Sequence, residues 1–209
     1  MLVDFHTHLL PTAEGSIVPR SFGIHPWQSA SFSESDMPQI LSALSDGCSQ
    51  PSITMVGECG LDKLRGASFD FQVSLFQLHL QVAETVGKPV VVHCVRAMEQ
   101  LVALRRQRQW QRTWVVHGFT GSSQQALQLD RIGIGCSFGA AILNPQHHKA
   151  IAALQQLGKD RLFLETDDSG LSIADIYVAA AYWLEITVEE LEEAIFLHYC
   201  RLIQHIPTL

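Results

Sequence analysis

Short apolar runs alternate along the chain with longer segments in which apolar residues recur at helical spacing. The runs predict seven strands, at residues 2–7, 21–24, 53–58, 90–93, 114–117, 134–137 and 162–166. The longer segments predict helices at residues 37–44, 69–86, 97–108, 123–129, 145–157, 173–184 and 188–205. The strand cores are apolar on both faces, which is typical of parallel strands covered by helices on both sides. The pattern therefore predicts an α/β fold with a parallel sheet.

Residue types that bind metal ions stand where five of these strands end. They are His6, His8, Glu58, His93, His117 and Asp167. An open doubly wound sheet would carry a glycine-rich phosphate loop after its first strand, whereas this first strand ends in His-Thr-His. Polar residues at the carboxyl ends of many strands favour a closed barrel, because the active site of such a barrel lies on that face. We therefore expect a TIM-like (β/α) barrel.

The number and spacing of these six residues predict two metal ions rather than one. His6 and His8 are two apart on a strand, so their side chains point the same way. Four histidines and two carboxylates exceed the ligands of one tetrahedral site, and they suit two adjacent ions that share a carboxylate and a hydroxide. Glu58 is the expected bridge, because it falls between the first histidine pair and the later histidines. Each motif alone is weak evidence, so the prediction depends on the joint pattern.

Length and composition narrow the class of protein. The chain has 209 residues, which is enough for one sizeable core and short for two, so we expect a single domain over residues 1–209. No apolar run is long enough to span a bilayer, and no basic region precedes a hydrophobic stretch at the N-terminus. The five cysteines are scattered without a CxxC pair. We therefore expect a cytoplasmic protein that has neither disulfides nor membrane contacts.

The net charge of −7 argues against binding nucleic acid through a broad basic surface. The expected metal site differs in charge from the rest of the chain. Four neutral histidines, two carboxylates, two divalent ions and a hydroxide leave it with a formal charge of about +1. Such a site attracts an anionic substrate even on an acidic protein.

Several motifs occur in the order found in one family of enzymes. They are DFHTHL, GIHP, VGECGLD, KPVVVHC, HGFTG and LETDD. Together they resemble the TatD family of metal-dependent hydrolases, with a likeness that runs from Asp4 to Asp168. A fainter likeness continues into HYCRLI of the last helix, where His198 replaces the asparagine of the family.

The resemblance implies a distorted, amidohydrolase-like barrel that carries two divalent metal ions. It implies that His6, His8 and Asp167 bind one ion, that His93 and His117 bind the other, and that Glu58 is shared. Members of the family are mostly described as deoxyribonucleases, some with exonuclease activity, and many only as hydrolases. Histidine-rich ligation favours zinc, with manganese or iron next and magnesium after them.

The chain departs from the family pattern at three places. Arg96 is displaced by one position, after Val95, from the arginine of the family. The usual Pro-Tyr-Leu is absent after the ETD motif, where Ser169 and Gly170 stand instead. The segment between Thr7 and Gly23 is too short for the family's helix, strand and helix. The chain therefore resembles a shortened member with seven strands, whose substrate contacts at the altered motifs stay open.

We expect an enzyme that cleaves phosphodiester bonds in DNA, with nucleic acid as its substrate and Asp167 as the general base. His25, in GIHP, is expected to bind phosphate or to support the metal site, and Arg96 to contact substrate. Glu165 lies deeper than Asp167 and is expected to orient a ligand histidine. Hydrolysis of an amide, lactone or cyclic amide is the alternative reaction. A metal-binding scaffold without turnover is the alternative class.

Overall fold

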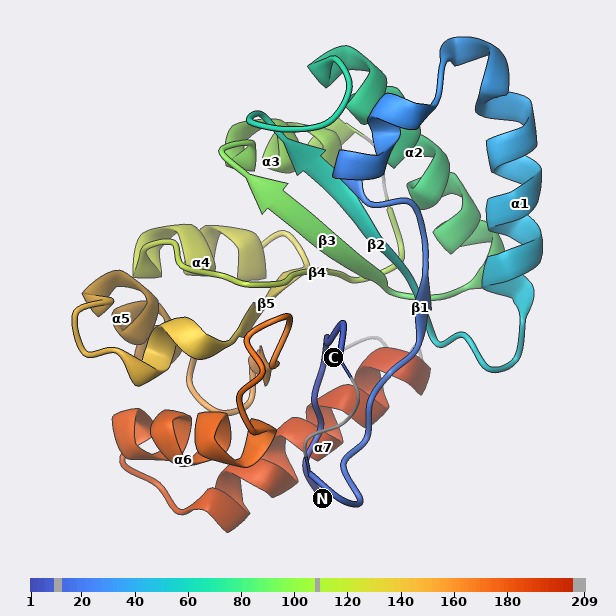
Figure 1. Cartoon of the computed structure of the whole chain (residues 1–209). Coiled ribbons are helices and arrows are strands. Elements are labelled where there is room, and N and C mark those ends of the chain that lie inside the picture. Colours follow the sequence, from blue (N-terminus) through green and yellow to red (C-terminus); the bar gives the residue numbers. More distant parts are fainter. Residues whose placement is uncertain (10–12, 108–109, 205–209) are drawn as a thin grey trace. The chain divides into compact units, whose positions relative to one another are not determined.

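The computed structural model describes residues 1–9, 13–107 and 110–204 (Figure 1). The predicted helix ends at Arg108 and His205 lie outside these residues. The chain divides into two compact units, which we call the central unit, Arg20–Val115, and the terminal unit, Met1–Pro19 with Val116–Leu209. No helix of the described part is long and apolar enough to cross a membrane. The single-domain prediction stays a prediction.

The central unit is a parallel sheet with helices packed on it. Its strands, in hydrogen-bonded order, are β1 (Ser21–Phe22), β2 (Met55–Asp62) and β3 (Val90–Val95). Its helices are α1 (Met37–Ser49), α2 (Phe69–Val86) and α3 (Met98–Gln107), with 3-10 turns η1 (Pro26–Ser31) and η2 (Glu34–Asp36). Helix α2 packs on β2, and α1 packs on α2 (Figure 1). Ser68 caps the start of α2 by accepting from Phe71, and Gly87 ends it with a φ of 74°.

Strands β2 and β3 are longer than predicted. The sequence prediction ended them at Glu58 and His93, and this was wrong because β2 runs on to Asp62 and β3 to Val95. Gly57 explains the difference in β2, where the pairing register shifts between Val56 and Cys59. Its φ of 129° and the nearby Val91 carbonyl leave no room for a side chain. The strand thus passes an irregularity at Glu58 without ending there.

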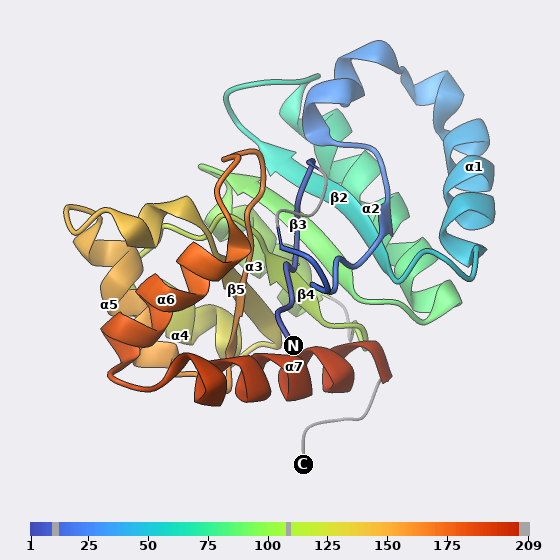
Figure 2. The ribbon, with the colours of Figure 1, turned by 60° about the horizontal axis from the view of Figure 1, so that its bottom comes forward.

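The terminal unit contains the last strands and helices of the chain. Strand β4 (Trp114–Val116) leads into it, followed by α4 (Ser123–Asp130), β5 (Ile134–Phe138), η3 (Ala140–Leu143), α5 (His148–Leu157), β6 (Leu162–Leu164), α6 (Ile173–Leu184) and α7 (Val188–Gln204). Strands β5 and β6 are parallel. Helices α6 and α7 pack on each other and on β6, as the turned view shows (Figure 2). These positions agree closely with the predicted elements.

The predicted first strand, residues 2–7, forms only isolated bridges, so the described residues contain six regular strands rather than seven. Val3 pairs in parallel with Ile17, and Thr7 pairs in parallel with Asp167. Each of these pairings involves a single residue of the segment, so no continuous strand ladder forms. Residues 13–20 contain no helix, and only Ile17 pairs with the first segment. This agrees with the predicted loss of a helix-strand-helix step as far as the described residues reach.

Candidate metal centre

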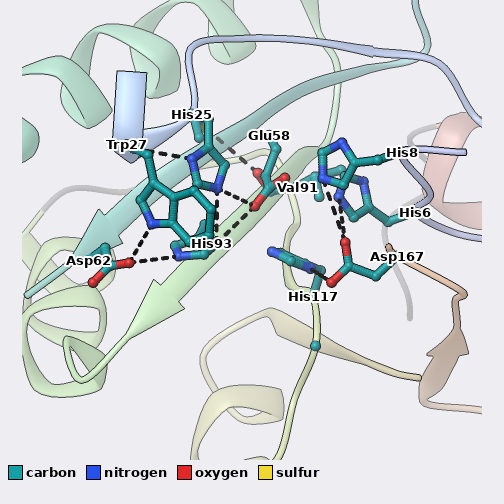
Figure 3. Close-up of polar contacts among 12 residues, drawn as sticks. His6, His8, His25, Trp27, Glu58, Asp62, Val91, His93, His117 and Asp167 are labelled. Atoms are coloured by element: carbon teal, nitrogen blue, oxygen red, sulfur yellow. Dashed lines mark hydrogen bonds and ion pairs between the residues drawn. The ribbon is translucent and has the colours of Figure 1, made fainter. Parts of the chain in front are cut away.

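The predicted metal-binding residues form two groups of donors, one in each unit (Figure 3). The central group consists of His25, Glu58 and His93. The terminal group consists of His6, His8, His117 and Asp167. Every predicted ligand thus lies beside at least one other predicted ligand of its own unit.

Glu58 is the centre of the central group. Its Oε1 atom lies 2.9 Å from Nδ1 of His93 and 3.0 Å from Nε2 of His25. The two histidine nitrogens are 3.3 Å apart. The side chain of Glu58 is only 5% exposed, so its charge is removed from most of the surrounding water. A buried carboxylate needs a positive or hydrogen-bonding partner.

The hydrogen bonds of His25 define its proton position. Its Nδ1 atom accepts the backbone N–H of Trp27 at 3.1 Å. A neutral imidazole that accepts at Nδ1 carries its proton at Nε2. Nε2 therefore donates to Glu58, which makes His25 a support of that carboxylate. Of the two expected roles of His25, the geometry favours support of the metal site over direct phosphate binding.

His93 presents the opposite nitrogen to Glu58 because Asp62 lies behind it. The Oδ2 atom of Asp62 is 3.3 Å from Nε2 of His93 and accepts from Nε1 of Trp27 at 2.7 Å. Burial alone would raise the pKa of Asp62, but hydrogen bonds from Trp27 and Leu64 outweigh it and lower this pKa. An ionised Asp62 accepts from Nε2, so the lone pair of Nδ1 faces Glu58.

Nδ1 of His93 and Oε1 of Glu58, two acceptor atoms 2.9 Å apart, repel each other unless a proton or a cation lies between them. The ligand atoms of a tetrahedral ion lie about 2.1 Å from it and about 3.4 Å from one another. At 2.9 Å, the facing atoms of His93 and Glu58 are close enough to bind the same cation. Asp62 was not among the predicted site residues, although it stands in the VGECGLD motif four positions after Glu58. Its contact with His93 depends on the neighbouring strand, which the sequence pattern does not show.

The side chains of the terminal group lie farther apart than those of the central group. The Oδ1 atom of Asp167 lies 3.6 Å from Nε2 of His8 and 3.9 Å from Nε2 of His6. Its Oδ2 atom lies 4.0 Å from Nδ1 of His117. These distances are too long for hydrogen bonds. The distances from His6 and His8 are near the spacing of ligands around one ion, so a cation would bridge these two histidines and Asp167.

The backbone of Asp167 is fixed to the His-Thr-His segment. Its N–H donates to the carbonyl of His6 at 2.9 Å, and its carbonyl accepts from the N–H of His8 at 3.1 Å. The hydroxyl of Thr7 donates to the same carbonyl at 3.1 Å. Asp167 has a φ of 51°, a conformation that aspartate tolerates better than most residues. The turn thereby holds the carboxylate against both histidines.

Two buried carboxylates, Glu165 and Asp4, contact residues of the terminal group or its turn. Glu165 is fully buried, accepts the backbone N–H of Gly118, and lies 3.5 Å from Nδ1 of His117. Burial acts to raise the pKa of Glu165, but the interaction with His117 prevails and lowers it. This contact orients His117 with Nε2 as the coordinating nitrogen. Asp4 accepts both the N–H and the hydroxyl of Thr166, so it braces the ETDD turn.

The residues at the altered motifs lie apart from these contacts. Arg96 is exposed directly after β3 and, among the described residues, makes no polar contact with either donor group. The hydroxyl of Ser169 donates to the carbonyl of Thr166, and Gly170 continues the same exposed turn. Substrate contact by Arg96 stays a prediction.

Comparison with known proteins identifies relatives over most of the chain. A family model described as "TatD related DNase" matches residues 3–203. The chain is 31% identical over 148 residues to the uncharacterized metal-dependent hydrolase YjjV of Escherichia coli K12, covering 70% of this chain and 56% of that protein. It is 30% identical over 163 residues to the 3'-5' ssDNA/RNA exonuclease TatD of Edwardsiella piscicida, covering 74% and 59%. The matches thus span less than two thirds of the relatives' length.

Solved structures show the same fold. The crystal structure of the TatD homologue YJJV from E. coli K12 matches with a TM-score of 0.77 and 25% identity, covering 94% of this chain and 79% of that chain. A TatD family hydrolase from Entamoeba histolytica matches with a TM-score of 0.74 and 17% identity, covering 90% and 75%. The predicted TIM-like α/β fold is therefore confirmed.

Proposed function

Because this chain belongs to the TatD family, we propose that it is a divalent-metal-dependent hydrolase that cleaves phosphodiester bonds in DNA. One observation supports the proposal most. In both units, carboxylate and imidazole acceptors lie at separations that suit ligands of a cation. Such a set attracts metal ions and, through them, an anionic substrate. Two of the relatives described above carry the names metal-dependent hydrolase and ssDNA/RNA exonuclease.

The proposed ligands are the six residues singled out from the sequence. They are His6, His8, Glu58, His93, His117 and Asp167. The assignment of Glu58 as a shared ligand comes from the sequence and the family resemblance. Four imidazoles and two carboxylates favour zinc, with manganese or iron next and magnesium after them.

Divalent ions at these donors would lower the pKa of a bound water and polarise a phosphoryl oxygen. The chain itself supplies the proton acceptor and the positioning. Asp167 is 33% exposed and backbone-anchored, so its carboxylate can reach a water and accept its proton. The Oε1 atom of Glu58 contacts His25 and His93. We assign Glu58 to metal binding and not to proton transfer. Glu165 and Asp62 hold His117 and His93 in their coordinating orientations.

The five cysteines are free thiols, as is usual in reducing compartments. On that ground we propose the cytoplasm as the location.

Purified protein, analysed for bound metals, tests the proposed reaction on three substrates. These are single-stranded DNA, bis(p-nitrophenyl) phosphate and a lactone panel. We expect metal-dependent cleavage of the DNA and of the nitrophenyl diester, with both activities lost on chelation. Turnover of a lactone without turnover of either diester would replace the proposed reaction with the alternative one. Full metal content without turnover of any substrate would favour a scaffold.

A further inference from the structure

A pocket of about 380 Å³ opens beside the central group of donors. The β2–α2 loop and the first turn of α2 form its walls, with Asp62, Lys63, Arg65, Phe69 and Gln72 among the lining residues. Asp62 also lies 3.3 Å from His93. Asp62 thus both lines the pocket and contacts a proposed metal ligand. Figure 3 shows its contacts with Trp27 and His93.

The pocket has a rigid base because Gln72 is nearly fully buried and ties the loop together. Its Nε2 atom donates to the carbonyls of Asp62, Arg65 and Ala67 at 2.8–3.0 Å. Its Oε1 atom accepts the N–H of Asp62 at 2.8 Å. All the polar atoms of this amide thus serve the loop. A loop held in this way presents its outward side chains in a fixed position.

Two cations line the pocket, and aromatic rings hold both. The Lys63 ammonium lies 5.2 Å from the ring centre of Phe69, and the Arg65 guanidinium lies 4.4 Å from that of Trp27. Both distances are within the range of cation–π attraction. Neither cation forms an ion pair in the part of the chain that the structure describes. Both residues line the pocket, so their positive charges lie beside it.

Asp62 is the acidic residue among the pocket walls, and its carboxylate is already engaged. Oδ1 accepts the N–H groups of Leu64 and Arg65 at 2.7 and 3.2 Å. Oδ2 accepts from Trp27 and faces His93. Both oxygens are thus occupied by the loop backbone, Trp27 and His93, and among the described residues neither forms an ion pair with Lys63 or Arg65. A pocket on an acidic protein thereby presents two positive groups.

We propose that this pocket binds a backbone phosphate of a single-stranded nucleic acid, next to the phosphate that is cleaved. The inference rests on the proposed function and adds a second contact for the strand. Grooves for single strands use cations that follow the phosphate backbone, and Lys63 and Arg65 line this pocket, each held over an aromatic ring. Its position beside Asp62 allows a strand with one phosphate at the central donors to reach Lys63 and Arg65.

The test compares two double variants that remove the same number of charges. Lys63→Gln with Arg65→Gln changes the pocket, and Arg106→Gln with Arg131→Gln changes two exposed arginines elsewhere. Binding of a labelled phosphorothioate oligonucleotide to the metal-loaded protein is measured by fluorescence anisotropy at several salt concentrations. We expect the pocket variant to bind about tenfold more weakly. The slope of log K against log salt concentration should also become shallower by about 1.4. Two phosphate contacts are lost, and each contact to a single strand contributes about 0.7 to this slope.

Cleavage separates failure of the pocket from failure of the proposed function. The pocket variant should lose at least about tenfold more activity on the oligonucleotide than on bis(p-nitrophenyl) phosphate, which has no neighbouring phosphate. Equal losses on both substrates, or equal strand affinity in the pocket and control variants, overturn the pocket while wild-type cleavage upholds the function. Absence of wild-type cleavage overturns the function, and the binding measurement still decides the pocket.

Discussion

The two donor groups differ in how tightly their own residues hold them. In the central group, Glu58 and the two histidines lie 2.9–3.3 Å apart, and Glu58 is 5% exposed. In the terminal group, Asp167 lies 3.6–4.0 Å from its histidines and is 33% exposed. The central donors therefore already lie within contact distance of one another, with His25 hydrogen-bonded to Glu58. The terminal donors lie farther apart, and the backbone hydrogen bonds of Asp167 position them.

The backbone explains this difference. Glu58 lies within β2 and His93 within β3, where paired strands fix both side chains. His8 follows an isolated bridge instead, and Asp167 forms that bridge with Thr7 just before a turn at Asp168. Donors on regular strands are positioned more exactly than donors on turns. We therefore expect substitutions in the central group to act mainly on metal binding and those at Asp167 mainly on turnover.

The largest expected effect is that of Glu58→Gln, which should lose metal and activity together. An amide at this position leaves His25 and His93 without the buried charge that both contact. Metal content by elemental analysis and the rate on bis(p-nitrophenyl) phosphate are measured on the same preparation. Glu193→Gln, an exposed position on α7, is the control and should change neither. Full metal content in Glu58→Gln would contradict its assignment as a ligand.

Asp167→Asn should come next, with a loss of turnover of about 100-fold, which is the usual worth of a positioned base. Much of the metal should remain, because His6 and His8 are unchanged. Burial raises the pKa of Asp167, which suits a group that takes up a proton. Asp168→Asn removes a neighbouring, exposed carboxylate as the matched control. A fully metallated Asp167→Asn with a near wild-type rate would show that another group accepts the proton.

The sequence predicted the family, the fold class and nearly all helix positions, because local periodicity and the order of motifs carry that information. It also singled out the residues that gather in the two donor groups. It did not predict the ends of β2 and β3, because polar residues at Glu58 and His93 resembled strand ends while Gly57 lets β2 continue. The contact of Asp62 with Trp27 and His93 joins distant residues, which no local pattern shows.

A smaller effect is expected for Asp62→Asn, which tests how far the central group depends on its supporting residues. The change removes the charge behind His93 and leaves the proposed ligands intact. Loss of such a partner usually weakens metal binding by about 10–100-fold, and competition with a chelator measures it. Trp27→Phe removes the Nε1 donor to Asp62 while it keeps an aromatic ring beside Arg65, and it should weaken binding less. An equal loss in both variants would mean that the loop, rather than the carboxylate, holds His93.

The smallest expected effect concerns one histidine in each unit, His79, which is fully buried, and His198, which is partly buried. His79 in the central unit is fully buried, accepts the N–H of Ile24 at 2.9 Å and lies 2.8 Å from the carbonyl of Leu75. Burial lowers the pKa of His79 to about 4, against a weaker opposing effect of the Leu75 carbonyl. His198 in the terminal unit stacks on Phe163, and burial also lowers its pKa. Because His198 is only partly buried, solvent reduces the effect of its charge on stability.

A histidine with a lowered pKa stabilises the folded state above the unfolded pKa of 6.5, and this stability is lost as the pH falls toward the folded value. For His79 the free energy of unfolding should fall by about 2 kcal/mol between pH 7 and pH 5, since a tenfold difference in proton affinity between the folded and unfolded states corresponds to about 1.4 kcal/mol. Urea unfolding at several pH values measures this loss. His79→Gln should remove most of the pH dependence, and His198→Gln should remove less. The contrary result is that His198→Gln reduces the pH dependence of the free energy of unfolding more than His79→Gln does. The acid sensitivity would then originate in the terminal unit and not at His79.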